Sequence, residues 1–374
     1  MNCYIGLMSG TSLDGVDGVL VSFGESGAAP IHVHAHAHRS FAEPLRDELL
    51  ALNSSGPDEL HRAALAANAL VESYAAVVNA LLQRAAVSAR RVRAIGAHGQ
   101  TVRHRPGEFD GVGYTLQLNA PALLAERCGI DVVADLRSRD VAAGGTGAPL
   151  VPAFHRSVFA RPDETLCVLN LGGIANLTVV HPDGRTLGFD CGPANALMDL
   201  WCKSRTGNDF DAGGAWAASG RVMEPLLRSM LDEPYFARTP PKSTGRDLFN
   251  GDWLSRHLSA RDSNDRPQDV QATLAELTAR TCAQDLERHA ADASRLLVCG
   301  GGALNAELMR RLGILLNGIT VMPTDALGLP ATQIEACAFA WLARAFVERQ
   351  PGNICSVTGA RGPRILGALY PAGA

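Results

Sequence analysis

Lysine is almost missing from this chain. Of its 34 basic residues only Lys203 and Lys242 are lysines, and the rest are arginines. The formal net charge is −4, whereas a nucleic-acid-binding protein usually carries a basic surface. We therefore expect no nucleic-acid partner. Hydrophobic residues make up 47% of the 374 positions, which is an ordinary balance for a globular protein of about two domains.

The cysteines lack the spacing that zinc sites and redox motifs need. There are nine, an odd number, and none forms a C-x-x-C pair. Several lie in apolar runs, which predicts buried free thiols in a reducing cytoplasm. The N-terminus shows no basic-then-apolar signal pattern, and we expect no apolar stretch long enough to cross a bilayer. The sequence thus predicts a cytoplasmic protein with no membrane partner.

Familiar nucleotide-binding motifs are also missing. Residues 241–247, PKSTGRD, hold the residue types of a Walker loop in the wrong order. A polar loop is the favoured interpretation there, and a phosphate contact by Lys242 or Arg246 is the alternative. Residues 299–305, CGGGALN, lack the G-x-G-x-x-G spacing of a dinucleotide fold. Three consecutive glycines leave backbone exposed, so an adenosine contact or a plain helix start are both possible there.

The chain opens with an unusual glycine turn. Residues 3–8 and 16–23 read as the two strands of a hairpin, and residues 31–37 as a third strand. The turn combines small hydroxyls, glycines and two acids, Asp14 and Asp17. Glycine lets backbone N–H groups approach phosphate oxygens. The turn is therefore a candidate phosphate loop, with a tight hairpin turn as the alternative.

The same pattern returns in the second half. Residues 165–180 again run as strand, glycine turn and strand, and helices are expected at about 267–290 and 331–348. Two such halves predict an α/β fold with two similar lobes and a nucleotide in a cleft between them.

Four groups of polar residues are candidates for chemistry. Asp190 stands before a Gly-Pro helix start, where it is either a cap or a general base. Residues 98–101 end a strand with donors suited to a sugar, and Arg137 suits a carboxylate. His32, His34, His36 and His38 alternate along one strand face of about 20 Å, too long for one ion. We interpret that row as a solvated edge strand.

Eight blocks occur together in one order along nearly the whole chain. They are GLMSGTSLDGVD, GAHGQT, DVVADLRSRDVAAGGTGAPLVPAFH, NLGGIANLT, GFDCGPANALMD, PKSTGRD, CGGGALN and GPRILGALYP. As a set they resemble the anhydro-N-acetylmuramic acid kinase family, which belongs to the superfamily of hexokinase, actin and the 70-kDa heat-shock ATPases. The resemblance implies a two-lobed actin/hexokinase-like α/β fold with a central nucleotide cleft. It places residues 1–134 and 352–374 in an N-terminal lobe and residues 135–351 in a C-terminal lobe.

The resemblance also implies a reaction. ATP and water would convert 1,6-anhydro-N-acetylmuramate to N-acetylmuramate 6-phosphate and ADP in cell-wall sugar recycling, with Mg²⁺ as cofactor and a homodimer as the assembly. Asp190 would be the general base. The nucleotide would be bound by Gly10, Thr11, Ser12, Leu13, Asp14, Gly15, Val16, Asp17, Gly172, Gly173, Gly300, Gly301 and Gly302. The sugar would be bound by His98, Gln100, Thr101, Asp135, Arg137 and Glu335.

Two positions depart from the expected patterns. Met8 stands where many sugar kinases of the superfamily carry an Asp, so the Mg²⁺ contact falls to Asp14, Asp17, Asp190 or water. Ala194 stands where the family usually has Gly. Two other functions remain open: a kinase for an ordinary sugar hydroxyl, which needs no water, and an ATP-driven switch of the actin or heat-shock type.

Overall fold

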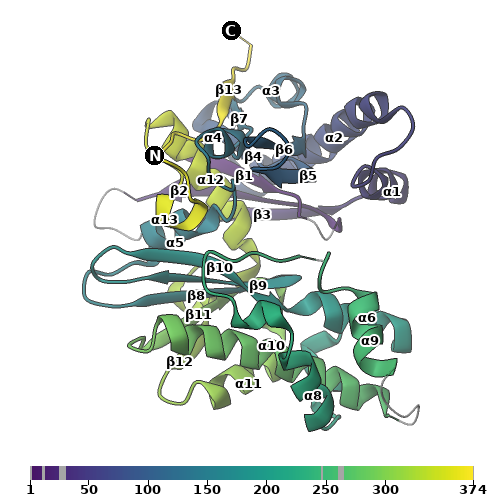
Figure 1. Ribbon diagram of the computed structural model, residues 1–374. Helices are drawn as coiled ribbons and strands as arrows, with labels where there is room; N and C mark the ends of the chain where they lie inside the picture. The colour runs from purple at the N-terminus through teal and green to yellow at the C-terminus, as the bar shows by residue number, and fades with distance from the viewer. Residues whose placement is uncertain (1, 11–12, 25–30, 246, 260–264, 374) are drawn as a thin grey trace. The chain divides into compact units, whose positions relative to one another are not determined.

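The computed structural model describes residues 2–10, 13–24, 31–245, 247–259 and 265–373. The chain divides into two compact units, each built around its own sheet (Figure 1). Unit 1 comprises Met1–Val158 and Gln333–Ala374, and unit 2 comprises Phe159–Thr332. Thr11 and Ser12, both predicted to bind nucleotide, lie outside the described residues.

Unit 1 is built on a six-stranded mixed sheet. Its strands run in the order β13 (Ala368–Tyr370), β7 (Val132–Ala134), β4 (Val92–Ala97), β1 (Cys3–Met8), β2 (Gly15–Phe23) and β3 (Ile31–Ser40). β1 pairs antiparallel with β2 and parallel with β4, while β3 forms the edge. The predicted hairpin and third strand are confirmed, because buried residues such as Leu7 and Leu20 recur along these strands.

Two helices cover the two faces of this sheet. The long α2 (Glu59–Ala85) packs its buried side against β2 and β3, and α12 (Ile334–Val347) packs on β1 and β4. Two glycines admit α12: a Cβ at Gly6 would lie 1.8 Å from Ala336 O, and one at Gly96 would lie 2.0 Å from Phe339 O. The helix backbone therefore rests directly on the two central strands.

α2 corrects one prediction from the sequence. By length and composition it is apolar enough to cross a membrane, contrary to our expectation that no stretch would be. Its apolar character comes from a run of Ala, Leu and Val. Half of its most apolar window is buried inside unit 1, where Val77 and Leu81 lie in the core under Gly18 of β2. Its apolar side thus serves the core of unit 1.

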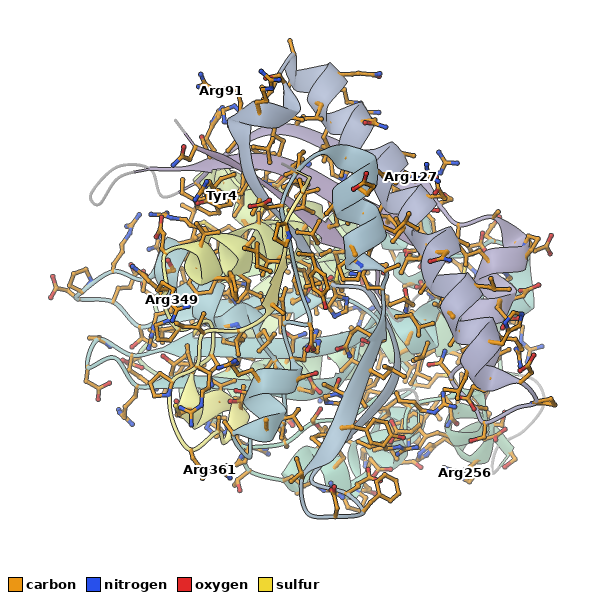
Figure 2. All side chains as sticks on the ribbon, turned by 90° about the horizontal axis from the view of Figure 1, so that it is seen from above. Tyr4, Arg91, Arg127, Arg256, Arg349 and Arg361 are labelled. Atoms are coloured by element: carbon orange, nitrogen blue, oxygen red, sulfur yellow. The ribbon has the colours of Figure 1, made fainter. Side chains whose placement is uncertain are left out.

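The remaining elements of unit 1 connect and cover the sheet. They are α1 (Glu43–Ala51), β5 (Gln100–Pro106), β6 (Gly113–Leu118), α3 (Pro121–Cys128), α4 (Ser138–Ala142), α5 (Val151–Phe159) and α13 (Cys355–Thr358). Figure 2 shows Arg91, Arg127, Arg349 and Arg361 projecting outward from the ribbon, and all four are exposed. Arginine thus supplies the solvated positive charge of unit 1, which contains no lysine.

Unit 2 has a five-stranded sheet in the order β10 (Thr186–Pro193), β9 (Ile174–Val180), β8 (Leu166–Leu171), β11 (Arg295–Cys299) and β12 (Thr320–Pro323). Its helices are α6 (Asn195–Thr206), α7 (Ala215–Ala218), α8 (Glu224–Leu231), α9 (Gly251–Ser259), α10 (Pro267–His289) and α11 (Ala306–Leu315). α10 is buried along most of its length and packs against β9, β10 and four helices. The predicted second strand–turn–strand is confirmed as β8 and β9.

The unit boundaries differ from those that the sequence suggested. We placed them at 134/135 and 351/352, whereas the structure divides at 158/159 and 332/333. The difference moves α4, α5 and α12 into unit 1. α12 belongs there because it lies on β1 and β4, an attachment that its apolar sequence alone does not reveal.

Candidate functional site

The glycine turn of unit 1 presents backbone rather than side chains. Leu13 and Val16 are only 5% and 0% exposed and belong to the core of unit 1. Asp14 is exposed and Asp17 is partly exposed. Gly15 is required by packing, since a Cβ there would lie 2.3 Å from Arg39 O of β3. Any nucleotide contact by Leu13, Gly15 or Val16 would therefore use their backbone groups.

A hydrogen-bond network fixes the start of this turn. Tyr74 OH of α2 lies 3.0 Å from Ser9 Oγ, which donates to Gly99 O at 3.1 Å, and Gly99 N donates to the Tyr74 hydroxyl at 3.1 Å. Gln100 Nε2 donates to Gly10 O at 3.0 Å. The strand end at 98–100, predicted to hold the sugar, thus also anchors the glycine turn.

His98 is locked as a neutral ring. Its Nδ1 lies 3.1 Å from the carbonyl of Ser9, which can only accept, so Nδ1 carries the proton. Its Nε2 accepts from Nε and Nη2 of Arg137 at 3.1 and 2.9 Å. Burial and the Arg137 charge lower the pKa of His98 to about 3. His98 therefore orients Arg137 and does not act as an acid near neutral pH.

Arg137 brings positive charge to a group of carboxylates. It also donates to Gly147 O at 2.8 Å, and burial lowers its pKa to about 10. Burial raises the pKa of Glu335, at the start of α12, while the Arg137 charge opposes that rise. The charges of Asp14 and Asp17 raise the pKa of Glu335 further. Arg137, Glu335, Asp14 and Asp17, all predicted site residues of unit 1, thus affect one another electrostatically.

The row of histidines lies on the edge strand β3, as predicted. His36 Nε2 and His38 Nδ1 donate to the same oxygen of Asp17, Oδ1, at 3.0 and 3.2 Å. His34 Nε2 is bonded to Ser22 Oγ at 2.8 Å. Across the described part of the chain, no three His, Cys, Asp or Glu side chains converge to hold a metal ion. Two members of the row thus hold a candidate nucleotide-binding acid.

Other predicted sugar-binding residues are placed less directly. Asp135 is exposed in the left-handed region with φ 55°, and Thr101 Oγ1 accepts from Gln117 Nε2 at 3.2 Å. Asp140, the second acid of the DLRSRD block, is fully buried and accepts from Gly147 N, Asn353 Nδ2 and Thr358 Oγ1. Asp140 therefore has a structural role: its hydrogen bonds hold the segment that follows Arg137 in place.

Sequence reasoning missed one candidate in unit 1. Among the described residues, both side-chain polar atoms of Asn119 and the Oε1 of Gln100 are buried without a hydrogen-bond partner. The Cβ of Asn119 lies beside Gly99. Buried amides normally have partners, so these atoms are suited to a polar ligand. Asn119 follows a strand end just as His98 does, which was the available signal.

Asp190 stands in unit 2 at an irregularity of β10. The register against β9 shifts between Asp190 and Gly192, which turns the chain toward α6. The carboxylate is partly exposed, and its Oδ2 accepts from Ser243 Oγ at 2.8 Å and from Thr244 N at 3.0 Å. Burial raises its pKa, and these two donors oppose the rise. No bond ties its side chain to the first turn of α6 in the described residues, which favours the base over the helix cap.

Packing requires glycine at some positions of unit 2 and not at others. A Cβ at Gly172 or Gly173 would meet nothing closer than 3.7 Å, so packing does not demand glycine in this turn. A Cβ at Gly300 would lie 2.4 Å from Asn170 Oδ1, and one at Gly302 would lie 2.5 Å from Leu171 Cβ. Gly300 and Gly302 are thus explained by packing, while Gly172, Gly173 and the exposed Gly301 remain open to a ligand.

Lys242 corrects the phosphate contact considered for PKSTGRD. Its Nζ is buried and bonds both carboxylate oxygens of Asp285, at 3.1 and 2.9 Å. A buried, paired ammonium does not reach a ligand. Arg246, the alternative in the same block, lies outside the described residues. The residues of this block that contact the Asp190 carboxylate are Ser243 and Thr244, which the sequence did not single out.

Comparison with known proteins supplies the identity. The family description "Anhydro-N-acetylmuramic acid kinase" matches residues 2–372. An anhydro-N-acetylmuramic acid kinase of Albidiferax ferrireducens is 59% identical over 99% of both chains, and one of Bordetella petrii is 60% identical over 99% of this chain and 96% of its own. A solved xylulose kinase of Rhodospirillum rubrum is 14% identical, with a TM-score of 0.44 over 92% of this chain and 90% of its own.

The full-length matches confirm the resemblance that the eight sequence blocks carry, and with it a kinase activity. The α/β architecture expected with it is present in both compact units. The chain belongs to the anhydro-N-acetylmuramic acid kinase family.

Proposed function

We propose that this protein converts 1,6-anhydro-N-acetylmuramate, ATP and water to N-acetylmuramate 6-phosphate and ADP, in the cytoplasmic recycling of cell-wall sugar. The family match supports the substrate, since relatives about 60% identical carry that name. The single observation that supports the chemistry is the setting of Asp190. It is a partly exposed carboxylate held by two donors on one oxygen, with a raised pKa.

Asp190 acts as the general base in this proposal. It takes a proton from water, and the water oxygen bonds to C1 of the sugar while the C1–O6 bond breaks. The released O6 bonds to the γ-phosphorus as the bond from that phosphorus to the ADP oxygen breaks. A raised pKa suits a base that must hold a proton briefly near neutral pH. The two donors on Oδ2 fix the direction of the carboxylate.

The glycine turns supply the phosphate contacts. Gly172 and Gly173 turn their carbonyls to the backbone N–H groups of Ala194, Asn195 and Ala196 at 3.0–3.1 Å. Packing does not require glycine at these two positions. A close approach of the backbone to a phosphate would explain why the turn lacks side chains. Gly301 is the matching candidate for the adenosine. In unit 1, the backbone of Gly10 and of residues 13–17 takes the same role.

Mg²⁺ fits the acids of unit 1. Asp14, exposed just before β2, and Asp17, partly exposed on β2, offer carboxylate oxygens. Mg²⁺ typically uses one or two carboxylates together with phosphate and water oxygens. The ion would neutralise phosphate charge. Arg137, oriented by His98, is suited to the lactyl carboxylate of the sugar. The unpartnered Oε1 of Gln100 and the unpartnered amide of Asn119 are suited to its hydroxyl or acetamido groups.

The test is a product analysis in labelled water. The protein is incubated with ATP, Mg²⁺ and the anhydro sugar in H₂¹⁸O, and the product is examined by mass spectrometry. The expected product is a sugar 6-phosphate with the label at C1. A 6-phosphate without label would support the ordinary sugar kinase, and ATP turnover independent of sugar would support the ATP-driven switch. The expected homodimer is checked separately by light scattering.

A further inference from the structure

One buried ion pair in unit 2 involves Lys242, whose backbone carbonyl also accepts a hydrogen bond from the candidate base, Asp190. Lys242 and Asp285 have side chains that are only 1% and 3% exposed. Lys242 belongs to the irregular segment before α9, and Asp285 lies on the buried α10. In residues 238–245, Lys242 is the one residue whose side chain is buried. The segment is therefore attached to unit 2 at this side chain.

The two charges of this pair are almost fully removed from water, so each depends on the other. The Lys242 ammonium also lies over the rings of Phe189 and Tyr235, at 5.5 and 5.3 Å, and these cation–π contacts favour its charge only weakly. Arg288 lies 3.7 Å from Asp285 and is half exposed. Moving two charges out of water costs several kcal/mol per ion, so such a pair contributes little net stability over apolar residues. One attested use of a buried pair is to fix the register of the chain around it.

The segment held by Lys242 is the one that holds Asp190. The backbone N of Asp190 donates to Lys242 O at 3.2 Å, and the next two residues give both donors to Asp190 Oδ2. On the other side, Tyr235 OH donates to Asp190 O at 2.7 Å. A shift of Lys242 would thus move the backbone partner and both side-chain partners of Asp190 together.

We propose that Lys242, fixed by Asp285, is a positioning residue that holds Asp190 in the orientation required for proton abstraction. The inference rests on the proposed function, in which Asp190 is the base. With both donors on Oδ2, the other oxygen, Oδ1, is directed to the water. The charged and titratable groups around the pair are Tyr235, Arg288, His289, Cys191 and Cys282.

The test uses two variants, Lys242→Met and Lys242→Met/Asp285→Leu. The double variant removes both charges, so no unpaired buried carboxylate remains to unfold the protein. A displacement of about 1 Å can cost about 10²-fold in rate. We therefore expect kcat to fall by roughly 10- to 100-fold in both variants, with KM for ATP within about twofold. The acid limb of kcat/KM moves to higher pH, because the Lys242 charge lowers the pKa of Asp190.

Arg311→Met is the matched control. Arg311 is also buried and paired, with Glu276 at 2.6 Å and Glu307 at 2.8 Å, and it makes no described contact with Asp190 or residues 241–245. It is expected to lower the melting temperature while kcat and the pH profile stay unchanged.

The possible outcomes separate the two ideas. A folded double variant with unchanged kcat, or one whose loss appears only in KM with an unmoved acid limb, would overturn the positioning role. If the Asp190→Asn variant kept the wild-type turnover, the general-base role in the proposed function would fail, and this inference with it. An inactive Asp190→Asn beside fully active Lys242 variants would overturn the inference alone.

Discussion

The two units treat their candidate carboxylates differently. In unit 1, the rise in the pKa of Glu335 is opposed by a charge, the Arg137 guanidinium, which is itself oriented by His98. In unit 2, the rise in the pKa of Asp190 is opposed mainly by neutral donors, Ser243 Oγ and Thr244 N. Burial raises the pKa in both cases. A neutral donor fixes direction without adding charge, which suits a group that must gain and lose a proton.

The difference suggests a division of labour. Unit 1 has charges of both signs in Asp14, Asp17, Arg137 and Glu335, which the proposed function uses for phosphate, metal and a substrate carboxylate. Unit 2 keeps the Lys242 ammonium buried and paired with Asp285, and gives the Asp190 carboxylate two neutral donors on Oδ2. The predictions below test this contrast.

Asp190→Asn should have the largest effect. The amide keeps the shape but cannot accept the proton from water. General bases contribute roughly 10²–10⁴-fold, so we expect kcat to fall by at least that range, with the affinity for ATP largely kept. Steady-state kinetics and calorimetric ATP titration measure the two quantities. Asp183→Asn, at an exposed turn of the same unit, is the control. Near-normal turnover would remove Asp190 from the mechanism.

Arg137→Met should be the next largest. It removes the charge that lowers the pKa of Glu335 and leaves His98 Nε2 without its donor. Losing a charged hydrogen bond costs about 1.5–3 kcal/mol, so kcat/KM for the sugar should fall by roughly 10- to 100-fold. Arg139→Met, an exposed neighbour on α4, should leave it unchanged. An equal loss in both variants would contradict a specific role for Arg137.

Ser243→Ala should have a smaller effect with a clear direction. Ser243 stabilises the carboxylate form of Asp190, so removing its hydroxyl raises the pKa of Asp190 further. Activity needs the deprotonated base and is lost as the pH falls through that pKa. The acid limb of kcat/KM therefore moves to higher pH, with kcat lower by about tenfold at most. Ser219→Ala, also exposed in unit 2, is the control, and an acid limb that moves downward would refute the assignment.

Substitutions in the two glycine segments of unit 2 should have different effects, one on stability and the other on ATP binding. Gly302→Ala forces a Cβ against Leu171 and should destabilise unit 2 by about 1–3 kcal/mol in urea unfolding. In Gly173→Ala the new Cβ makes only an ordinary contact, 3.7 Å from Ala196 Cβ, so the stability of this variant should change by no more than about 0.5 kcal/mol. Its KM for ATP should rise instead. If Gly173→Ala left KM unchanged, the turn would lose its role in binding phosphate.

The smallest effect is expected at His98. Its pKa is lowered to about 3, so the ring should stay neutral from pH 5 to 8. Nitrogen-15 spectra of the histidines should show a resonance with the proton on Nδ1 that does not move over this range. A His98 signal that titrates near pH 6 would show that it carries charge and does not simply orient Arg137.

Local pattern predicted much of the fold. Alternating apolar residues gave the hairpin of β1 and β2, and the repeated strand–turn–strand gave β8 and β9. The placement of α12 could not be read in this way, because an apolar helix is compatible with any covered sheet face. The positions where α12 rests on the sheet are Gly6 and Gly96. In the sequence alone, neither differs from an ordinary glycine in a strand.

The site was predicted in part for a similar reason. The sequence left Asp190 as either a helix cap or a general base, because the contacts of its side chain with Ser243 and Thr244 come from a segment more than 50 residues away. The burial of Lys242 could not be predicted, because its partner Asp285 lies 43 residues away on another element. A polar sequence such as PKST gives no sign that one of its side chains is enclosed.

The attachment of α12 has a consequence for the order of folding. The helix that closes one face of the first sheet is made after all of unit 2 has been synthesised. Unit 2 is continuous and can fold as it leaves the ribosome. Strands β1 and β4, although made early, must wait with one face uncovered until residues 334–347 emerge. A chain that stops short of those residues would expose that face to aggregation.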